Sequence, residues 1–485
     1  MVFSSYLFIF YFLPIALLLY YVVPRRAQHL VLTIVSFIFY GWANPLFSFL
    51  LLFSTLVDYI AGLVITLGGP GAWSQPIHRL AVGGRRVRRQ RVALILSICT
   101  NLTLLAFFKY FNFGVESYNG LIDKLGLPEW GLDITLRVAL PLGISLYILQ
   151  SLSYVIDVFR GHSTAIKSFI DFLCFETMYP QLVAGPIIRY SEIEDQLQHR
   201  TSTTTKCARG IAFFALGLAK KVLLANPCGK IADLAFEAGS LSVVDAWYGV
   251  VSYAFQIYFD FSGYSDMAIG LGLMLGFVFP KNFDSPYRSQ SLTEFWRRWH
   301  ISLSAWLRDY LYVPLGGNRK GPARTYVNLF TVMLLGGLWH GAAWTFVIWG
   351  ALHGLLLIAE RLLGKAAVYR RLPMPVRVGV TFILVLFTWV FFRASDLPLA
   401  VRYLGDMLAL GDPQEGAGLL AGIIYKPYYL GTVLLAAVIV WGAPQTWDWT
   451  RTLTMPKAAA AMGVLVLSVV VLATQAYNPF IYFIF

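Results

Sequence analysis

The chain has 485 residues, of which 58% are hydrophobic and 13% are charged, with a mean hydropathy of +0.65 and a formal net charge of +13. Soluble domains carry about 25% charged residues, so this chain has too few to cover a water-exposed surface. Several apolar runs are long enough to cross a bilayer, which takes about 20 helical residues. The short alternating segments typical of a membrane β-barrel do not occur in the sequence. The composition therefore excludes a soluble protein and predicts an all-α polytopic integral membrane protein.

In chain order, the apolar runs predict about 10–12 transmembrane or re-entrant helices. The first run has no basic residue before it and no small-residue cleavage site, so we expect a retained span and not a signal peptide. The candidate spans are 3–23, 28–40, 46–66, 92–111, 138–158, 168–188, 209–226, 246–278, 326–362, 376–393, 428–443 and 460–477.

Three of these segments are unlike a simple span. Residues 246–278 and 326–362 are too long for one crossing, so each is expected to bend, to be partly re-entrant or to hold two shorter helices. Residues 168–188 contain two prolines and a glycine near their end, which predicts a broken or re-entrant segment.

Basic residues predict the orientation. The loop after the third span is cytoplasmic by the positive-inside rule, because it holds Arg79, Arg85, Arg86, Arg88, Arg89 and Arg91 without an acid. Alternation then places Arg25 and Arg26 inside, Met1 outside and the acidic loop 112–135 outside. The basic segment 280–325 is also expected on the cytoplasmic side. Topology alone explains most of the net charge; a cytosolic polyanionic ligand is compatible with it, and no nucleic-acid partner is expected.

No second soluble domain is visible, so we expect a single domain over 1–485. The cysteines Cys99, Cys174, Cys207 and Cys228 form no CxxC pair, which favours buried free thiols over a disulfide framework or a zinc site. The histidines are scattered and no HExxH occurs, so no metal is expected.

His340 is the first candidate functional residue, because it lies in the apolar run 326–362 between Gly336, Gly337 and Gly341. An ionisable group inside a membrane run is a functional hypothesis by default. A histidine satisfied by a neighbouring helix is an equally good interpretation from position alone.

His300 is the second candidate, within a cluster rich in tryptophan and arginine. Helical spacing predicts that Trp296, His300 and Ser304 share one face. Such a cluster commonly anchors a helix at the membrane interface, but its guanidinium groups also suit phosphate. His353 lies about 20 Å and 220° from His340 on a straight helix, so the two share a site only if the chain breaks between them. The remaining His29, His78, His162 and His199 lie in polar loops and receive no role.

Asp260 and Asp266 form a third cluster, six residues apart in an apolar stretch. Paired carboxylates for acid–base chemistry are one interpretation. A hydrogen-bond network between helices is the favoured one. No Walker A or GxSxG motif occurs, so neither ATP hydrolysis nor a serine hydrolase is supported.

Together these motifs resemble the membrane-bound O-acyltransferase family. The resemblance rests on Trp296-Arg297-Arg298-Trp299-His300, followed by Trp339-His340-Gly341. The segments 258–270, 315–319, 1–5 and 478–483 look like the branch that contains the membrane component of alginate O-acetyltransferase. The resemblance covers essentially the whole chain.

The resemblance implies many helices ringing a thin central region with a funnel from each side. It implies that His340 is the family's near-invariant histidine and that His300 occupies the second family position. It also implies a bacterial inner-membrane protein that works with a separate extracytoplasmic polysaccharide acetyltransferase. The expected activity is transfer of acetyl groups from cytosolic acetyl-CoA for O-acetylation of an exported polysaccharide such as alginate.

A thioester donor is already activated, so the chemistry needs a base for the acceptor hydroxyl and a donor to the oxyanion. We assign His340 as the base, since an apolar run favours its neutral form, and His300 or a nearby N–H as the polarising group. No bound cofactor is expected. The residues expected to hold the acyl donor are Arg297, Arg298, Arg308, Arg319, Lys320, Trp296 and Trp299. An acidic acyl carrier protein would suit the same surface.

Four alternatives stay open. One is D-alanyl transfer from a carrier protein to teichoic acid, and another is acyl transfer to a lipid. A transporter would show repeated halves with broken helices, which the sequence does not. A non-catalytic scaffold of a polysaccharide secretion complex would tolerate replacement of His340.

Overall fold

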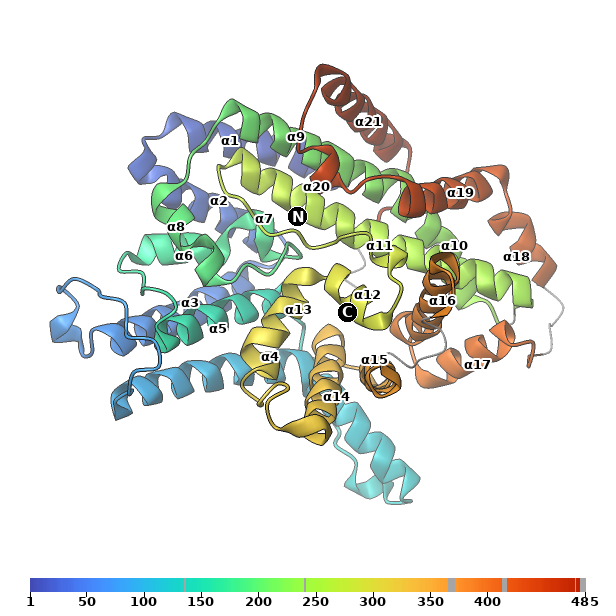
Figure 1. Ribbon diagram of the computed structural model, residues 1–485, viewed down its shortest axis with the longest axis horizontal. Coiled ribbons are helices and arrows are strands. Elements are labelled where there is room, and N and C mark those ends of the chain that lie inside the picture. The colour runs from blue at the N-terminus through green and yellow to red at the C-terminus, as the bar shows by residue number, and fades with distance from the viewer. Residues whose placement is uncertain (135–136, 240, 365–370, 412–416, 476, 480–485) are drawn as a thin grey trace. The chain divides into compact units, whose positions relative to one another are not determined.

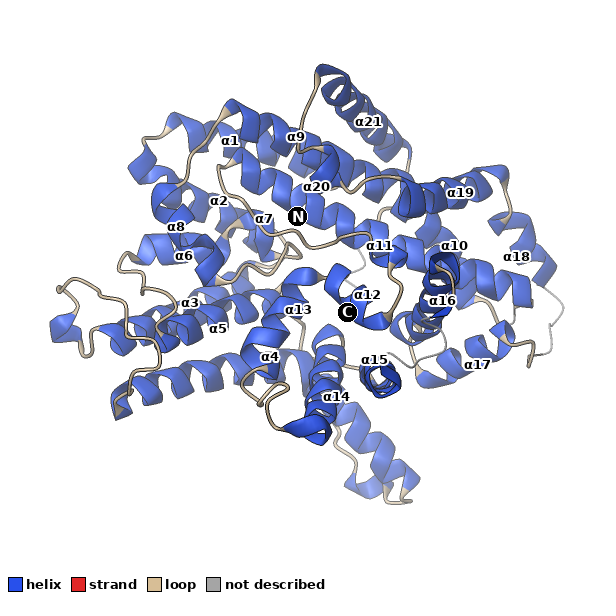
Figure 2. Ribbon diagram, viewed as in Figure 1, coloured by secondary structure: helices blue, strands red, loops and turns tan. Residues whose placement is uncertain are grey.

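The computed structural model describes residues 1–485 apart from 135–136, 240, 365–370, 412–416, 476 and 480–485. Helices are the only regular elements in the described part of the chain, which confirms the all-α prediction (Figures 1 and 2). The chain divides into two compact units, one of residues 1–203 with 275–279 and one of residues 204–274 with 280–485. The single domain and the ring with two funnels stay predictions.

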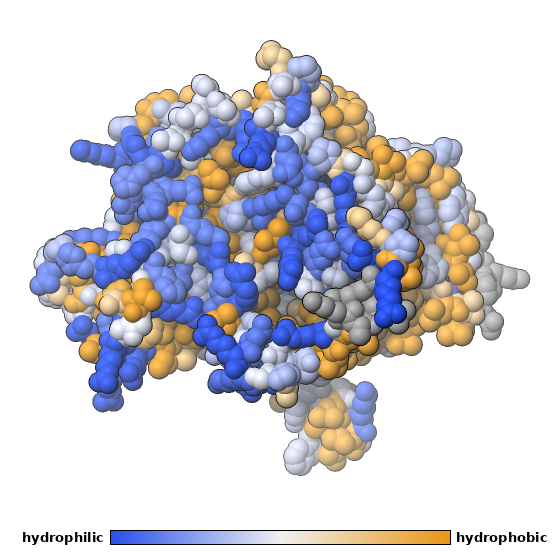
Figure 3. Space-filling model, in the orientation of Figure 1, coloured by the Kyte–Doolittle hydropathy of each residue, from blue (hydrophilic) through white to orange (hydrophobic). Residues whose placement is uncertain are grey.

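Five described helices are long and apolar enough to span a membrane, which confirms a polytopic membrane protein. They are α3 (Pro45–Thr66), α4 (Arg88–Lys124), α15 (Trp344–Leu363), α16 (Met374–Arg393) and α21 (Met455–Thr474). Two shorter apolar stretches are Leu7–Val22, which ends in α1 (Leu13–Val22), and α19 (Pro427–Gly442). Many of their outward side chains are large and apolar, as Figure 3 shows around α19. The other predicted spans correspond to shorter or more polar helices.

In the first unit, polar side chains hold the helices together. Asp58 of α3 accepts hydrogen bonds from Ser97 Oγ at 2.5 Å and from Asn101 Nδ2 at 2.9 Å, both on α4. Such interhelical bonds satisfy groups that are costly in an apolar surrounding. The other helices of this unit are α2 (Gln28–Gly41), α5 (Ile144–Arg160), α6 (Phe169–Thr177), α7 (Tyr179–Leu182) and α8 (Tyr190–His199). The predicted break in 168–188 is confirmed, because Met178 separates α6 from α7.

In the second unit, α9 (Thr204–Ala219) packs along α11 (Val243–Met274) through glycines. A Cβ at Gly217 would lie 2.5 Å from the Gly263 carbonyl oxygen, and one at Gly210 would lie 2.6 Å from that of Gly270. Backbones approach this closely only where side chains are absent. The two short helices considered for 246–278 do not occur. Instead α11 is one continuous helix, and α9 and the π-helical turn after it pack along it and pair its acidic side chains.

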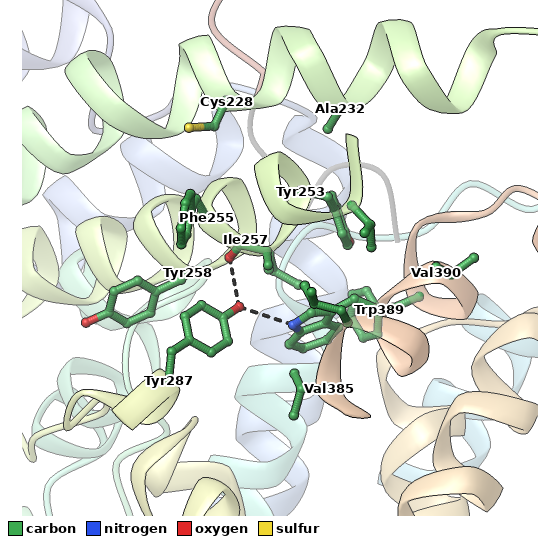
Figure 4. Close-up of a cluster of buried hydrophobic side chains, with 14 of the residues drawn as sticks. Cys228, Ala232, Tyr253, Phe255, Ile257, Tyr258, Tyr287, Val385, Trp389 and Val390 are labelled. Carbon is green, nitrogen blue, oxygen red and sulfur yellow. Dashed lines mark hydrogen bonds between the residues drawn. The ribbon is translucent and has the colours of Figure 1, made fainter. Parts of the chain in front are cut away.

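The remaining helices build the rest of the second unit. They are α10 (Asn226–Glu237), α12 (Leu292–Arg298), α13 (Ile301–Leu307), α14 (Gly321–His340), α17 (Leu397–Met407), α18 (Ala417–Ile424) and α20 (Thr446–Trp449), besides α15, α16, α19 and α21. Of the three alternatives for 326–362, the structure shows the two shorter helices, α14 and α15. A buried aromatic cluster joins α11, α12, α15 and α16. At its centre the Tyr287 hydroxyl accepts from Trp389 Nε1 at 3.1 Å and donates to the Ala254 carbonyl at 2.8 Å (Figure 4).

The cysteines are free thiols, as predicted, although only two of them are buried. Cys174 and Cys228 are buried, whereas Cys207 is partly exposed and Cys99 is exposed. A lipid-facing position on α4 suits an apolar thiol as well as a core position does.

The close approach of α9 and α11 predicts the effect of a single methyl group. Gly217→Ala should lower the stability of the folded protein by about 1–3 kcal/mol, because the methyl group meets backbone that cannot yield. Gly431→Ala in α19 is the matched control, since a Cβ there meets open space and alanine is the better helix former. Thermal unfolding of the detergent-solubilised protein measures both. Equal melting temperatures for the two variants would contradict this packing.

Candidate active site

A helix break positions His300. α12 ends at Arg298, and His300 adopts a left-handed conformation with φ of 44° before α13 begins. The flanking backbone is held by Asn282, whose carbonyl accepts from Ile301 N at 2.9 Å. The predicted helical face of Trp296, His300 and Ser304 is therefore wrong, because no helix is continuous across it.

The break also orients the imidazole. His300 is fully buried, and its Nδ1 accepts a hydrogen bond from Leu303 N at 3.4 Å, which caps α13. An accepting Nδ1 leaves the proton of the neutral ring on Nε2. Within the described part of the chain, this Nε2 has no hydrogen-bond partner. His300 thus has a buried donor that no described residue uses.

His340 ends α14, where Gly341 turns the chain toward α15. A Cβ at Gly341 would collide with the Phe346 ring, so only glycine fits this turn. The His340 ring lies 6.3 Å from that of His300 and 5.3 Å from that of Trp349, between ring centroids. The two histidines singled out from the sequence are therefore neighbours, although forty residues separate them.

A pocket of about 730 Å³ reaches His340. This volume lies in the range of small-molecule sites, which is about 300–1,000 Å³. Its walls are mostly apolar, with Trp296, Arg297, Arg308, Trp349 and Arg361 among the lining residues. The pocket therefore combines an apolar interior, one imidazole and several guanidinium groups.

The other residues expected to hold the donor do not line this pocket. Arg298 forms an ion pair of 2.8 Å with Glu294 and lines a neighbouring polar hollow of about 590 Å³, which Arg297 shares. Trp299 is buried in the aromatic cluster, stacked on Phe295. Arg319 and Lys320 are exposed in the turn before α14.

α15 holds α12 at two points that the sequence analysis did not assign. His353 Nδ1 accepts from Trp296 Nε1 at 3.3 Å. About two turns further along α15, on the same face, Glu360 Oε2 accepts from the backbone nitrogens of Leu292 at 2.9 Å and Thr293 at 3.2 Å. The sequence analysis required a break between His340 and His353 for the two to share a site. The structure has this break after His340, and Gly341 was the residue in the sequence that could have indicated it. Glu360 could have been noticed as an acid near an apolar run, whereas nothing distinguished Arg361.

Asp260 and Asp266 do not pair with each other. Asp260 lies 2.8 Å from Lys221 Nζ, and Asp266 lies 2.6 Å from Lys220 Nζ. Both lysines belong to the π-helical turn Lys220–Ala225 after α9. The acids therefore join α11 to this turn, which agrees with the interhelical network favoured from the sequence. Among the described residues, no group of three or more His, Cys, Asp or Glu side chains is placed to hold a metal ion.

Comparisons with known proteins identify the family of the chain. The family model of the membrane-bound O-acyltransferases matches residues 140–395, which include both histidines. The chain is 44% identical to a Pseudomonas putida protein named "probable alginate O-acetylase", over 100% of both chains. It is 37% identical to the peptidoglycan O-acetyltransferase of Helicobacter pylori, over 84% of this chain and 80% of that one.

A more distant likeness is to the teichoic acid D-alanyltransferase of Streptococcus thermophilus, at 31% identity over 45% of this chain and 56% of that one. The family model covers more than half of the chain, and the O-acetylase similarity extends over all of it. The chain is therefore a multi-pass membrane acyltransferase and belongs to the membrane-bound O-acyltransferase family.

Proposed function

We propose that this membrane O-acyltransferase moves acetyl groups from cytosolic acetyl-CoA across the bacterial inner membrane, for O-acetylation of an exported polysaccharide such as alginate. The observation that carries the proposal is the pocket that brings His340, beside His300, together with Arg297 and Arg361. Relatives named for alginate and peptidoglycan O-acetylation match most of the chain, whereas those named for D-alanyl transfer match less than half. This difference favours acetyl transfer.

The basic residues of the pocket suit the phosphates of the donor. Arg297 and Arg361 are exposed and have no hydrogen-bond or ion-pair partner in the described structure. Arg308 is less suited, since Asp309 already binds its guanidinium at 2.7 Å. Free guanidinium groups bind phosphate through two parallel hydrogen bonds. We therefore assign the donor's phosphates to Arg297 and Arg361, with the thioester directed toward His340.

The transfer uses His340, which lines the pocket, and His300, whose ring lies beside that of His340. His340 accepts the proton of the acceptor hydroxyl while that oxygen attacks the thioester carbonyl carbon. His300 Nε2–H stabilises the oxyanion of the tetrahedral intermediate. The intermediate collapses with loss of the CoA thiolate, which takes up a proton, and the acetyl ester remains on the acceptor. No metal and no bound cofactor enters these steps.

A membrane enzyme is needed because donor and final acceptor lie on opposite sides. Acetyl-CoA is charged and stays in the cytosol, while the polysaccharide is exported. A histidine reached from both sides lets the acetyl group cross without its carrier. We propose that an extracytoplasmic acetyltransferase then passes the group to the glycan.

The first test removes the proposed base. His340→Ala, expressed in a deletion strain, should lower the rate of acetyl transfer by about 10²–10⁴-fold, the usual contribution of a general base. The O-acetyl content of the exported polysaccharide should fall accordingly. Acetyl release from the purified polysaccharide measures the content, with membrane levels matched by immunoblot. His78→Ala is the control, because His78 lies in a loop outside the pocket.

Full restoration by His340→Ala would remove this assignment and favour a scaffold or a transporter. If the wild type and the deletion strain do not differ in acetylation, the acceptor is a teichoic acid or a lipid.

A second test concerns donor binding. Arg297→Gln and Arg361→Gln should each raise KM for acetyl-CoA about tenfold with little change in kcat, because each removes a charge-assisted hydrogen bond to phosphate. Arg319→Gln is the matched control, an exposed arginine outside the pocket. Rates are measured with reconstituted protein at varied acetyl-CoA. An unchanged KM in both pocket variants would show that the donor binds elsewhere or is carried by a protein.

A third test concerns the contact between α12 and α15. His353→Asn keeps an acceptor at the place of Nδ1 and should retain most of the activity, whereas His353→Leu should lose about fivefold, the value of one neutral hydrogen bond. The same kinetic assay, with gel filtration to confirm folding, distinguishes them. Equal rates for the two variants would mean that orientation of Trp296 does not matter.

A further inference from the structure

A second basic cluster lies in the first unit, around Arg200. Arg200 follows the end of α8 and is 7% exposed. Its guanidinium donates to Tyr20 Oη at 3.0 Å, to His29 Nε2 at 2.6 Å and to Gln28 Oε1 at 3.2 Å. It also lies over the Phe277 ring, 4.6 Å from the centroid. Its Nη1 also donates to the Leu197 carbonyl at 3.4 Å, so every polar partner is a neutral group.

The charge of Arg200 has no direct counter-ion. Asp171 is the nearest acid of the cluster, and it is reached only through His29, whose Nδ1 lies 2.5 Å from Asp171 Oδ1. Within the described residues, no carboxylate lies within ion-pair distance of Arg200 itself. Asp171 therefore balances this buried charge only across an intervening ring, and a second, closer anion would stabilise the guanidinium further. His29, which received no role from the sequence, belongs to α2 and orients the guanidinium.

A hollow of about 340 Å³ opens beside this guanidinium. It is lined by Arg25, Gln28, Arg200, Thr201 and Ser202. Arg25 uses only Nη2, which donates to the carbonyls of Gln198 at 3.1 Å and Arg200 at 3.0 Å. Its Nε and Nη1 have no partner in the described structure. The hollow therefore presents two guanidinium groups, an amide and two hydroxyls, and no acid.

Apolar side chains lie next to the hollow in the chain. Val22, three residues before Arg25, is 73% exposed, and Leu18 one turn earlier is 63% exposed. Leu30 and Ile34, on the first turns of α2, are 43% and 51% exposed. In a membrane protein such residues face lipid tails. An anion held by Arg25 therefore lies where the headgroup of a lipid would be.

We propose that this hollow binds a phosphate oxyanion, which Arg25 holds through Nε and Nη1 and which the charge of Arg200 attracts. The phosphodiester of an anionic membrane lipid is the source that the neighbouring apolar side chains favour. Free inorganic phosphate offers the same chemistry without the tails. The site does not depend on the acyl-transfer chemistry, so it is tested without an activity assay.

The experiment measures ligand-dependent stability of the purified full-length protein in neutral detergent. Dioleoyl-phosphatidylglycerol, inorganic phosphate and chloride at equal ionic strength are titrated separately, and the melting temperature is followed. Phosphatidylglycerol should raise it saturably in the wild type. In Arg25→Gln the midpoint should rise about tenfold, through loss of a charge-assisted hydrogen bond. Arg26→Gln is the matched control, an adjacent exposed arginine that does not line the hollow.

Arg25→Lys, which keeps the charge but not the two-pronged donor, should fall between the wild type and Arg25→Gln. Inorganic phosphate acting alone, with the same dependence on Arg25, would support the site with free phosphate as the source. Equal effects of Arg25→Gln and Arg26→Gln would overturn the proposal, because general surface charge would then explain the binding. The proposal would also be overturned if phosphatidylglycerol and phosphate raised the melting temperature no more than chloride does.

Discussion

Inside an apolar interior, a polar side chain is stable only where another group satisfies it, and this requirement accounts for many contacts in both units. Asp58 binds Ser97 and Asn101 in the first unit. In the second unit, Asp260 pairs with Lys221. These contacts join helices that are distant in sequence. The Nε2 atom of His300 is one of the buried atoms that have no hydrogen-bond partner among the described residues, and the His300 ring lies near that of His340. A group that develops negative charge there would accept the hydrogen bond from Nε2–H that no described residue accepts.

The pocket depends on two interruptions of helices. The break between α12 and α13 directs His300 into the interior, and the turn at Gly341 returns α15 along α14. Because of this return, α15 contacts the start of α12 through Glu360 and its middle through His353. These two contacts hold α12 through its backbone and through Trp296, and Arg297 takes no part in them.

The positive-inside rule accounts equally well for the presence of all these arginines. The groups that surround each guanidinium nevertheless differ. Arg298 and Arg308 already have carboxylate partners, whereas Arg297 and Arg361 are exposed without one in the described structure. Arg200 is buried among neutral acceptors. A count of basic residues therefore says little about anion binding, and the partners of each guanidinium say much more.

Local properties of the sequence determined the class of this protein. Composition predicted an all-α membrane protein, the prolines of 168–188 predicted a broken segment, and the motifs around His300 and His340 identified the family. Each of these depends on neighbouring residues along the chain. The tertiary structure alone decided that α11 is continuous, that His300 caps α13, and that His353 and Glu360 reach α12. Helical periodicity assumes an unbroken helix and does not indicate where a turn returns the chain, so contacts between residues 57 or 68 positions apart could not be read from it.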